Sequence, residues 1–193
     1  LMAGWTSAEL GMAIAFKAEK PTAATFAAQL EERFGALSED ALEAYPAGDD
    51  RQAMESAAAL ASDLFIAYST WKWIESHRET GKAPVYRYRF DRTMPGDPAS
   101  EFGAVHAVDI EYAFNTLASK RADWQQADRQ VAELMATTLA NFVKTGDPNG
   151  PGVPDWPAFG TSGEVMYFDT ASKAGPEEYR ARYEFLDSVV GKD

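Results

Sequence analysis

The residue that most suggests chemistry is a histidine. The chain has two histidines, His77 and His106, and His106 lies in the stretch FGAVHAVDIEYAF, residues 102–114. A histidine in a glycine-containing loop can serve as a general base near neutral pH. The alternative is that His106 only forms hydrogen bonds within its own loop. The local sequence does not separate these two interpretations.

Metal chemistry has less support in the sequence. A zinc site needs three or four ligands, and the chain offers one further histidine and no cysteine. The acids leave a carboxylate-only Mg²⁺ or Ca²⁺ site open, but no DxDxDG-like spacing is present. The absence of cysteine also excludes disulfides and thiolate nucleophiles, and it leaves the redox compartment undecided. His77 ends a charged helical stretch, where a polar group near the last carbonyls is the expected role.

Composition and charge exclude several classes of function. The chain has 193 residues, of which 46% are apolar and 25% charged, which is ordinary for a globular protein. A formal net charge of −12 disfavours binding to nucleic acid or anionic membranes. No apolar run reaches the roughly 18 residues that a membrane span needs. No signal peptide is visible, so the compartment stays open between the cytoplasm and export.

The elements that must position these residues alternate between short strands and longer helices. We expect strands at residues 1–4, 84–90 and 165–169. We expect helices at residues 22–35, 38–46, 50–80, 109–115, 123–144 and 177–190, with a break near residues 61–63. Widely spaced strands joined by helices indicate crossover connections and a helix-rich α/β fold. Three strands form a small sheet, and a sheet of this size in an α/β fold is normally part of a larger domain.

Several aromatic residues are expected to fill the core and not to bind a ligand. They are Trp71, Trp73, Tyr86, Tyr88 and Phe90. Trp156 lies between prolines and is expected to anchor a loop.

Four stretches of the sequence carry a resemblance to a known family. They are AGWTSAELG (3–11), DLFIAYSTWKWIESHRETGKAPVYRYRFD (63–91), GAVHAVDIEYAF (103–114) and LANFVKTGDPNGPGVPDWPAF (139–159). Together they resemble the C-terminal portion of the type-B carboxylesterases, a family of α/β-hydrolases that includes para-nitrobenzyl esterases and cholinesterases. They occur in the order expected for that family and span nearly the whole chain.

The resemblance assigns roles to three residues. His106 matches the triad histidine and Glu9 the triad acid, whose carboxylate accepts the histidine Nδ1–H and fixes its tautomer. The acid precedes the histidine, as the chain order of this fold requires. Asp109 stands where the family usually has glutamate, and it is implied to support the histidine loop by hydrogen bonding. As alternatives, Glu9 is a solvated loop acid and Asp109 a helix-start acid favoured by the helix dipole. Leu10 departs from the glycine common after the acid.

The serine nucleophile of the family is missing from the sequence. The nucleophile elbow requires G-x-S-x-G, and the nearest stretch, GTSGE (160–164), lacks the final glycine. The glycine-rich oxyanion loop is also missing. We therefore expect residues 1–193 to be a single C-terminal segment of an α/β-hydrolase domain, inactive alone. Its sheet edge is expected to pair with the missing N-terminal part or with a second copy.

The sequence thus predicts part of a serine carboxylesterase that hydrolyses small-molecule carboxylic esters through an acyl-enzyme, without metal or cofactor. The alternative is a noncatalytic binding protein on the same fold, as among cholinesterase-like adhesion molecules. A third possibility is a structural module without any site.

Overall fold

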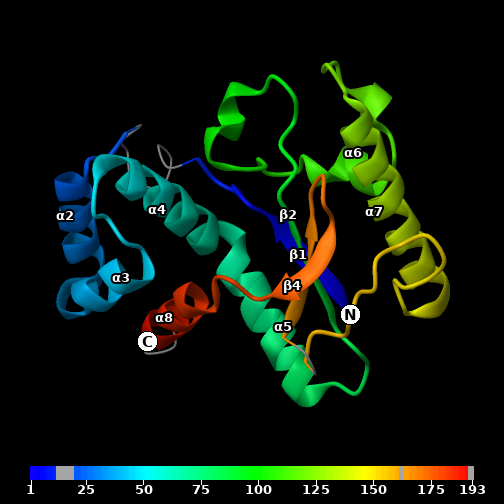
Figure 1. Cartoon of the computed structure of the whole chain (residues 1–193). Helices are drawn as coiled ribbons and strands as arrows, with labels where there is room; N and C mark the ends of the chain where they lie inside the picture. Colours follow the sequence, from blue (N-terminus) through cyan, green and yellow to red (C-terminus); the bar gives the residue numbers. More distant parts are fainter. Residues whose placement is uncertain (12–19, 161–162, 191–193) are drawn as a thin grey trace. The chain divides into compact units, whose positions relative to one another are not determined.

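The computed structural model describes residues 1–11, 20–160 and 163–190 (Figure 1). It divides into two compact units. The first consists of Leu1–Ser7 and Thr70–Glu178, and the second of Ala8–Ser69 and Tyr179–Asp193. None of the helices within the described residues has the length and apolar character to cross a bilayer.

The first unit is built on a four-stranded sheet with strand order β1-β2-β3-β4. The strands are β1 (Met2–Thr6), β2 (Tyr86–Phe90), β3 (Glu164–Phe168) and β4 (Lys173–Pro176). The pairs β1–β2 and β2–β3 are parallel, and β3–β4 is antiparallel. The helix-rich α/β fold is confirmed, and so are the three predicted strands.

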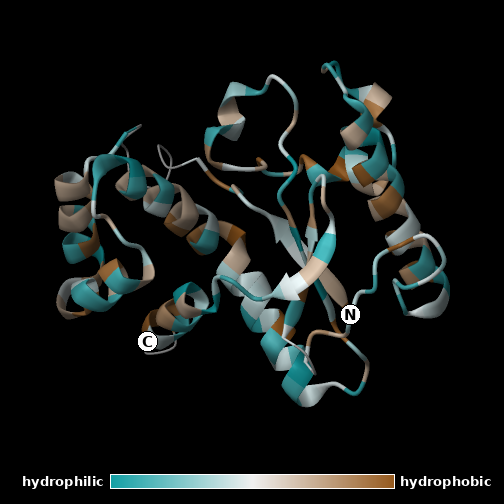
Figure 2. Cartoon of the chain, viewed as in Figure 1, coloured by the Kyte–Doolittle hydropathy of each residue, from teal (hydrophilic) through white to brown (hydrophobic). Residues whose placement is uncertain are grey.

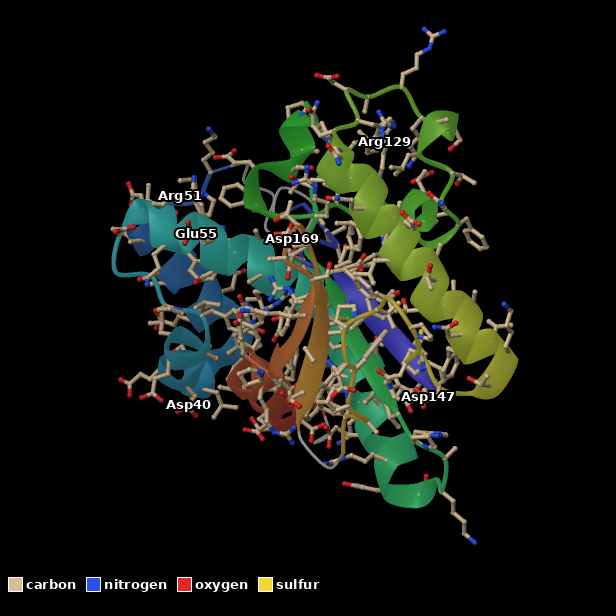
Figure 3. The ribbon with its side chains drawn as sticks, turned by 45° about the vertical axis from the view of Figure 1, so that its right-hand side comes forward. Asp40, Arg51, Glu55, Arg129, Asp147 and Asp169 are labelled. Carbon is tan, nitrogen blue, oxygen red and sulfur yellow. The ribbon has the colours of Figure 1, made fainter. Side chains whose placement is uncertain are left out.

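The fourth strand was not predicted. Lys173–Pro176 has no β-branched residue and no alternation, so its sequence carries no strand signal. Its pairing follows from a tight turn after β3, in which the Ser172 hydroxyl donates to the Asp169 carbonyl at 2.5 Å. This turn brings the chain back along β3, and Figure 3 labels Asp169 there.

The helices largely match the predicted ranges. They are α2 (Ala23–Phe34), α3 (Ser38–Ala44), α4 (Asp50–Ser62), α5 (Tyr68–Thr80), α6 (Asp109–Ala113), α7 (Gln126–Thr145) and α8 (Arg180–Val190). Short 3₁₀ segments are η1 (Gly35–Leu37), η3 (Pro98–Phe102) and η4 (Leu117–Ser119). Between α4 and α5 lies a π-helical segment, η2 (Asp63–Ala67), where the sequence predicted a break.

Local capping chemistry explains several helix ends. The Thr22 hydroxyl accepts from the Thr25 N–H at 3.2 Å, which caps α2. Gly146 ends α7 in the left-handed region with φ 80°, and its N–H donates to the Phe142 carbonyl. Along α4, Arg51 pairs with Glu55 one turn later at 2.7 Å (Figure 3).

One face of the sheet forms the core of the first unit. Alternation along β2 places Tyr86, Tyr88 and Phe90 on that face, and Figure 2 shows apolar residues on α6 and α7 as well. The Phe90 and Tyr112 rings meet edge to face with centroids 4.8 Å apart. The buried side chains of this core are Tyr86, Phe90, Ala104, Val108, Tyr112, Leu117, Val131, Ala132, Met135, Trp156, Met166 and Phe168.

The core prediction is wrong for one aromatic residue. Trp71 is 4% exposed, but Trp73 is 56% exposed. Trp71 and Ile74 are three residues apart and share the buried face of α5, so a residue between them points away from it. Trp156 is buried, and its backbone N–H donates to Asn149 Oδ1 at 2.7 Å, which confirms the loop anchor.

The second unit contains a buried polar cluster. The Tyr45 hydroxyl donates to Asp63 Oδ2 at 2.8 Å, and Arg182 Nε lies 2.9 Å from the same oxygen. Tyr45 and Asp63 are 1% and 2% exposed. The cluster therefore joins α8 to the π-helical segment and to the end of α3.

Candidate active site

The parallel strands bring their carboxyl ends to one edge of the sheet. The Ser7 N–H donates to the Phe90 carbonyl at 3.0 Å, and the Asp91 N–H donates to the Phe168 carbonyl at 2.9 Å. The segments that follow β1, β2 and β3 therefore emerge side by side. In open α/β sheets, ligands bind outside this carboxyl edge.

The loop that carries His106 is tied to this edge. It runs from η3 to α6, and the Ala104 N–H donates to the Ser7 hydroxyl at 2.8 Å. Ala104 is fully buried, whereas His106 is exposed. The loop is thus anchored just before the histidine, and the imidazole is accessible.

A strained turn presents the imidazole. The Val108 N–H donates to the Val105 carbonyl at 3.2 Å, which closes a four-residue turn with His106 second and Ala107 third. Ala107 has φ 63°, a left-handed value that alanine seldom adopts. Non-glycine residues in this region persist where the surroundings fix them, and they cluster at functional sites.

Asp109 lies three residues beyond the histidine, in the first turn of α6. Its Oδ2 accepts a hydrogen bond from the Tyr88 hydroxyl at 3.3 Å. Gly4 allows this arrangement, because a Cβ at Gly4 would lie 2.5 Å from the Tyr88 ring. Asp109 thus has a hydrogen-bonding partner on β2 as well as a helix-start position.

A second carboxylate, Asp128, contacts Tyr112 of α6 and was not singled out from the sequence. It is fully buried in the first turn of α7. Its Oδ1 accepts from Arg92 Nε at 2.6 Å and from the Tyr112 hydroxyl at 3.0 Å. Its Oδ2 accepts from the Gln125 N–H at 2.8 Å. Burial works to raise the pKa of Asp128, but the donors outweigh it and the pKa is lowered.

The other predicted site residues fall in different places. Glu9 is buried, with 5% exposed, and belongs to the second unit, so its pairing with His106 in the first unit stays a prediction. His77 lies in the last turn of α5, as predicted. Ser162, in the stretch that resembles the nucleophile elbow, lies outside the described residues. Across residues 1–11, 20–160 and 163–190, no group of three histidines or acids could hold a metal ion.

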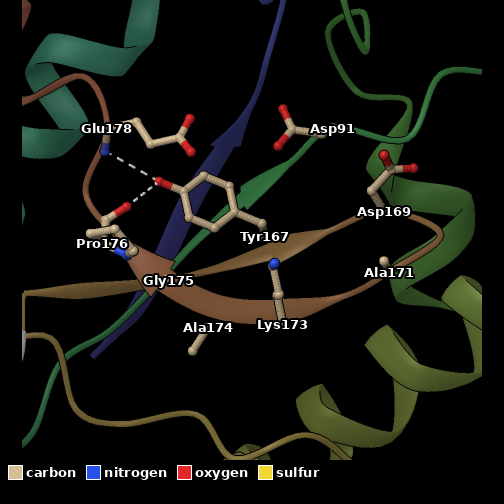
Figure 4. A pocket seen from close by; sticks show the side chains of 9 residues that line it. All are labelled: Asp91, Tyr167, Asp169, Ala171, Lys173, Ala174, Gly175, Pro176 and Glu178. Carbon is tan, nitrogen blue, oxygen red and sulfur yellow. Dashed lines mark hydrogen bonds between the residues drawn. The ribbon is translucent and has the colours of Figure 1, made fainter.

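A pocket of about 430 Å³ also opens near the carboxyl edge (Figure 4). It is lined by Asp91, Tyr167, Asp169, Ala171, Lys173, Ala174, Gly175, Pro176 and Glu178. The Tyr167 hydroxyl donates to the Pro176 carbonyl at 2.7 Å and accepts from the Glu178 N–H at 3.3 Å. Burial raises the pKa of Asp91. The lining holds neither serine nor histidine, so this pocket has no serine–histidine pair.

Comparison with known proteins gives one family. The sequence model of the carboxylesterase family matches residues 9–186. Carboxylesterase 4A of Bos taurus is 29% identical over 130 residues, which cover 66% of this chain and 23% of that protein. Carboxylesterase 5A of Felis catus is 32% identical over 122 residues, which cover 59% of this chain and 22% of that protein. A medium-chain fatty acyl-CoA hydrolase precursor of Anas platyrhynchos is 29% identical over 137 residues, which cover 66% of this chain and 23% of that protein. The chain spans less than a quarter of each of these relatives.

Proposed function

The chain belongs to the carboxylesterase family, and we propose that it supplies the acid and the histidine of a serine carboxylesterase. In this mechanism a serine hydroxyl attacks the ester carbonyl while His106 Nε2 takes its proton. Glu9 accepts the Nδ1–H of His106 and stabilises the imidazolium. His106 then gives the proton to the departing alcohol, and a water molecule, activated in the same way, releases the acid from the acyl-enzyme.

The observation that carries this proposal is the hydrogen bond between Ala104 and Ser7. Glu9 follows Ser7 by two residues, and His106 follows Ala104 by two residues. Two residues of extended chain span at most about 7 Å. The loop that carries His106 is therefore tied to the carboxyl end of β1, and Glu9 follows that end closely in the sequence. The exposed imidazole further supports a role in proton transfer.

We place the nucleophile outside residues 1–193. No G-x-S-x-G stretch occurs in the sequence, and the relatives are at least four times longer than the segment they share with it. The serine and the oxyanion donors then come from another part of the complete protein. On this proposal the chain by itself does not hydrolyse esters.

The test uses the complete protein and a chromogenic ester such as p-nitrophenyl acetate. His106→Ala is expected to lower kcat by a factor on the order of 10³ or more, because the serine loses its base. Glu9→Gln is expected to lower kcat as well, with less change in KM. His77→Ala is the matched control and should keep normal turnover. Normal turnover in His106→Ala would remove this residue from the mechanism.

A covalent probe locates the nucleophile independently. A fluorophosphonate should label the complete protein on a serine, and peptide mass spectrometry should place that serine outside residues 1–193. Labelling of a serine within this range would contradict the proposed division of the site. Relatives such as the cocaine esterase of Homo sapiens bear names that describe hydrolysis, which favours the enzyme over a noncatalytic binding protein.

A further inference from the structure

We infer that Asp128 is a positioning residue, which holds the His106 loop in place through Tyr112 and α6. This inference rests on the proposed function for its catalytic consequence. Its structural part concerns the first unit alone and can be tested without any esterase activity.

The argument starts from α6, which has only five residues, Asp109–Ala113. A helix of one turn is not stable by itself, because nucleation costs more than its few hydrogen bonds return. Its position must come from packing. Val108 and Tyr112 are four residues apart, share one face and are both buried in the core cluster, with 3% and 0% exposed. Since Val108 closes the turn that presents His106, the position of α6 sets the position of the imidazole.

Asp128 provides the polar anchor of α6. The Tyr112 hydroxyl donates to its Oδ1 at 3.0 Å, and Arg92 Nε donates to the same oxygen at 2.6 Å. Arg92 follows β2, and the Gln125 N–H that binds Oδ2 starts α7. One carboxylate thus fixes three elements relative to one another: the chain after β2, α6 and α7. Three donors point at the two carboxylate oxygens of Asp128. An asparagine at this position cannot accept all three hydrogen bonds, because in either orientation its NH₂ group would face a donor.

The second unit contains the same chemistry without a histidine loop. There Tyr45 donates to Asp63, and Arg182 pairs with Asp63. Both tyrosines are fully or almost fully buried, and each binds an aspartate that also pairs with an arginine. Tyr45→Phe is therefore a matched control for Tyr112→Phe, since each removes one hydroxyl from a buried Tyr–Asp–Arg cluster.

The experiment observes the imidazoles directly by NMR. The chain has two histidines, so their Cε1–H signals are assigned with His77→Ala. Tyr112→Phe keeps the ring contact with Phe90 and removes only the hydroxyl, so it should fold. It is expected to shift the His106 signal, while the His77 signal stays in place. Tyr45→Phe should leave the His106 signal unchanged. An unchanged His106 signal in Tyr112→Phe would overturn the inference.

The complete protein supplies the catalytic readout. Tyr112→Phe should lower kcat about 10- to 100-fold with KM within twofold, because a small displacement of a catalytic group affects the transition state most. Asp128→Asn should show the larger loss and Asp128→Glu a partial recovery. Glu133→Gln, an exposed carboxylate on α7, is the charge control and should keep full kcat. Unchanged kcat in Tyr112→Phe, with His106→Ala inactive, refutes the positioning role alone. Activity retained in His106→Ala refutes the proposed function instead.

Discussion

Replacing Ala107 with glycine should stabilise the first unit. Ala107 has φ 63°. The left-handed conformation costs a residue with a Cβ about 1–2 kcal/mol. Glycine avoids this cost but loses about 0.5–1 kcal/mol more in backbone entropy when the chain folds. The difference favours glycine by about 0.5–1 kcal/mol, or roughly a two- to fivefold change in an opening equilibrium.

Hydrogen exchange measures this change locally. The Val108 N–H donates to the Val105 carbonyl across the strained turn, so its protection reports the opening of that turn. Ala107→Gly should slow exchange at this amide by the same two- to fivefold. The matched control is Ala99→Gly, an exposed residue of η3 without a positive φ, which should lose about 0.5–1 kcal/mol. A loss of protection in Ala107→Gly comparable with that control would refute the strain argument.

Three further substitutions test the buried polar groups. The pKa of Asp128 is lowered in the folded state, so the carboxylate contributes fully to the free energy of unfolding above roughly pH 4. This contribution is lost as the pH falls through the lowered pKa. In urea titrations, the difference in the free energy of unfolding between wild type and Asp128→Asn should therefore decrease below roughly pH 4. Asn149→Ala removes the hydrogen bonds to the backbone N–H and carbonyl of Trp156, which should lower the free energy of unfolding by about 1–3 kcal/mol. Denaturation followed by tryptophan fluorescence measures this loss. Arg182→Met leaves the Asp63 carboxylate buried without its cation, which should lower the free energy of unfolding by about 3–5 kcal/mol, measured in thermal melts. The double substitution with Asp63→Leu should restore part of this stability.

The parts of the fold that local chemistry determines were predictable from the sequence. Thr22 and Gly146 mark helix ends because a hydroxyl cap and a left-handed glycine act within one turn. The spacing of the strands predicted crossover connections, and the pairs β1–β2 and β2–β3 are parallel, as such connections require. Lys173–Pro176 gave no signal because the turn after β3 and the neighbouring strand create that pairing.

The candidate site was predictable only in part. His106 stood out by its type and its loop, and Glu9 and Asp109 through the resemblance to a family. Asp128 offered one local sign, an acid in the first turn of an expected helix, which is common to many helices. Its other partners, Arg92 and Tyr112, lie 36 and 16 residues away, so only the folded chain reveals the cluster.

The two borders of the sheet differ in character, and this has a consequence for how copies of the chain would assemble. β4 begins with Lys173 and ends with Pro176, and a charge and a proline both discourage the addition of a strand. β1, MAGWT, has neither, and among the described residues it has a neighbouring strand on one side only. Two copies joined through β1 about a twofold axis would expose only their β4 borders. Pairing of two copies through β1 would therefore stop at a dimer.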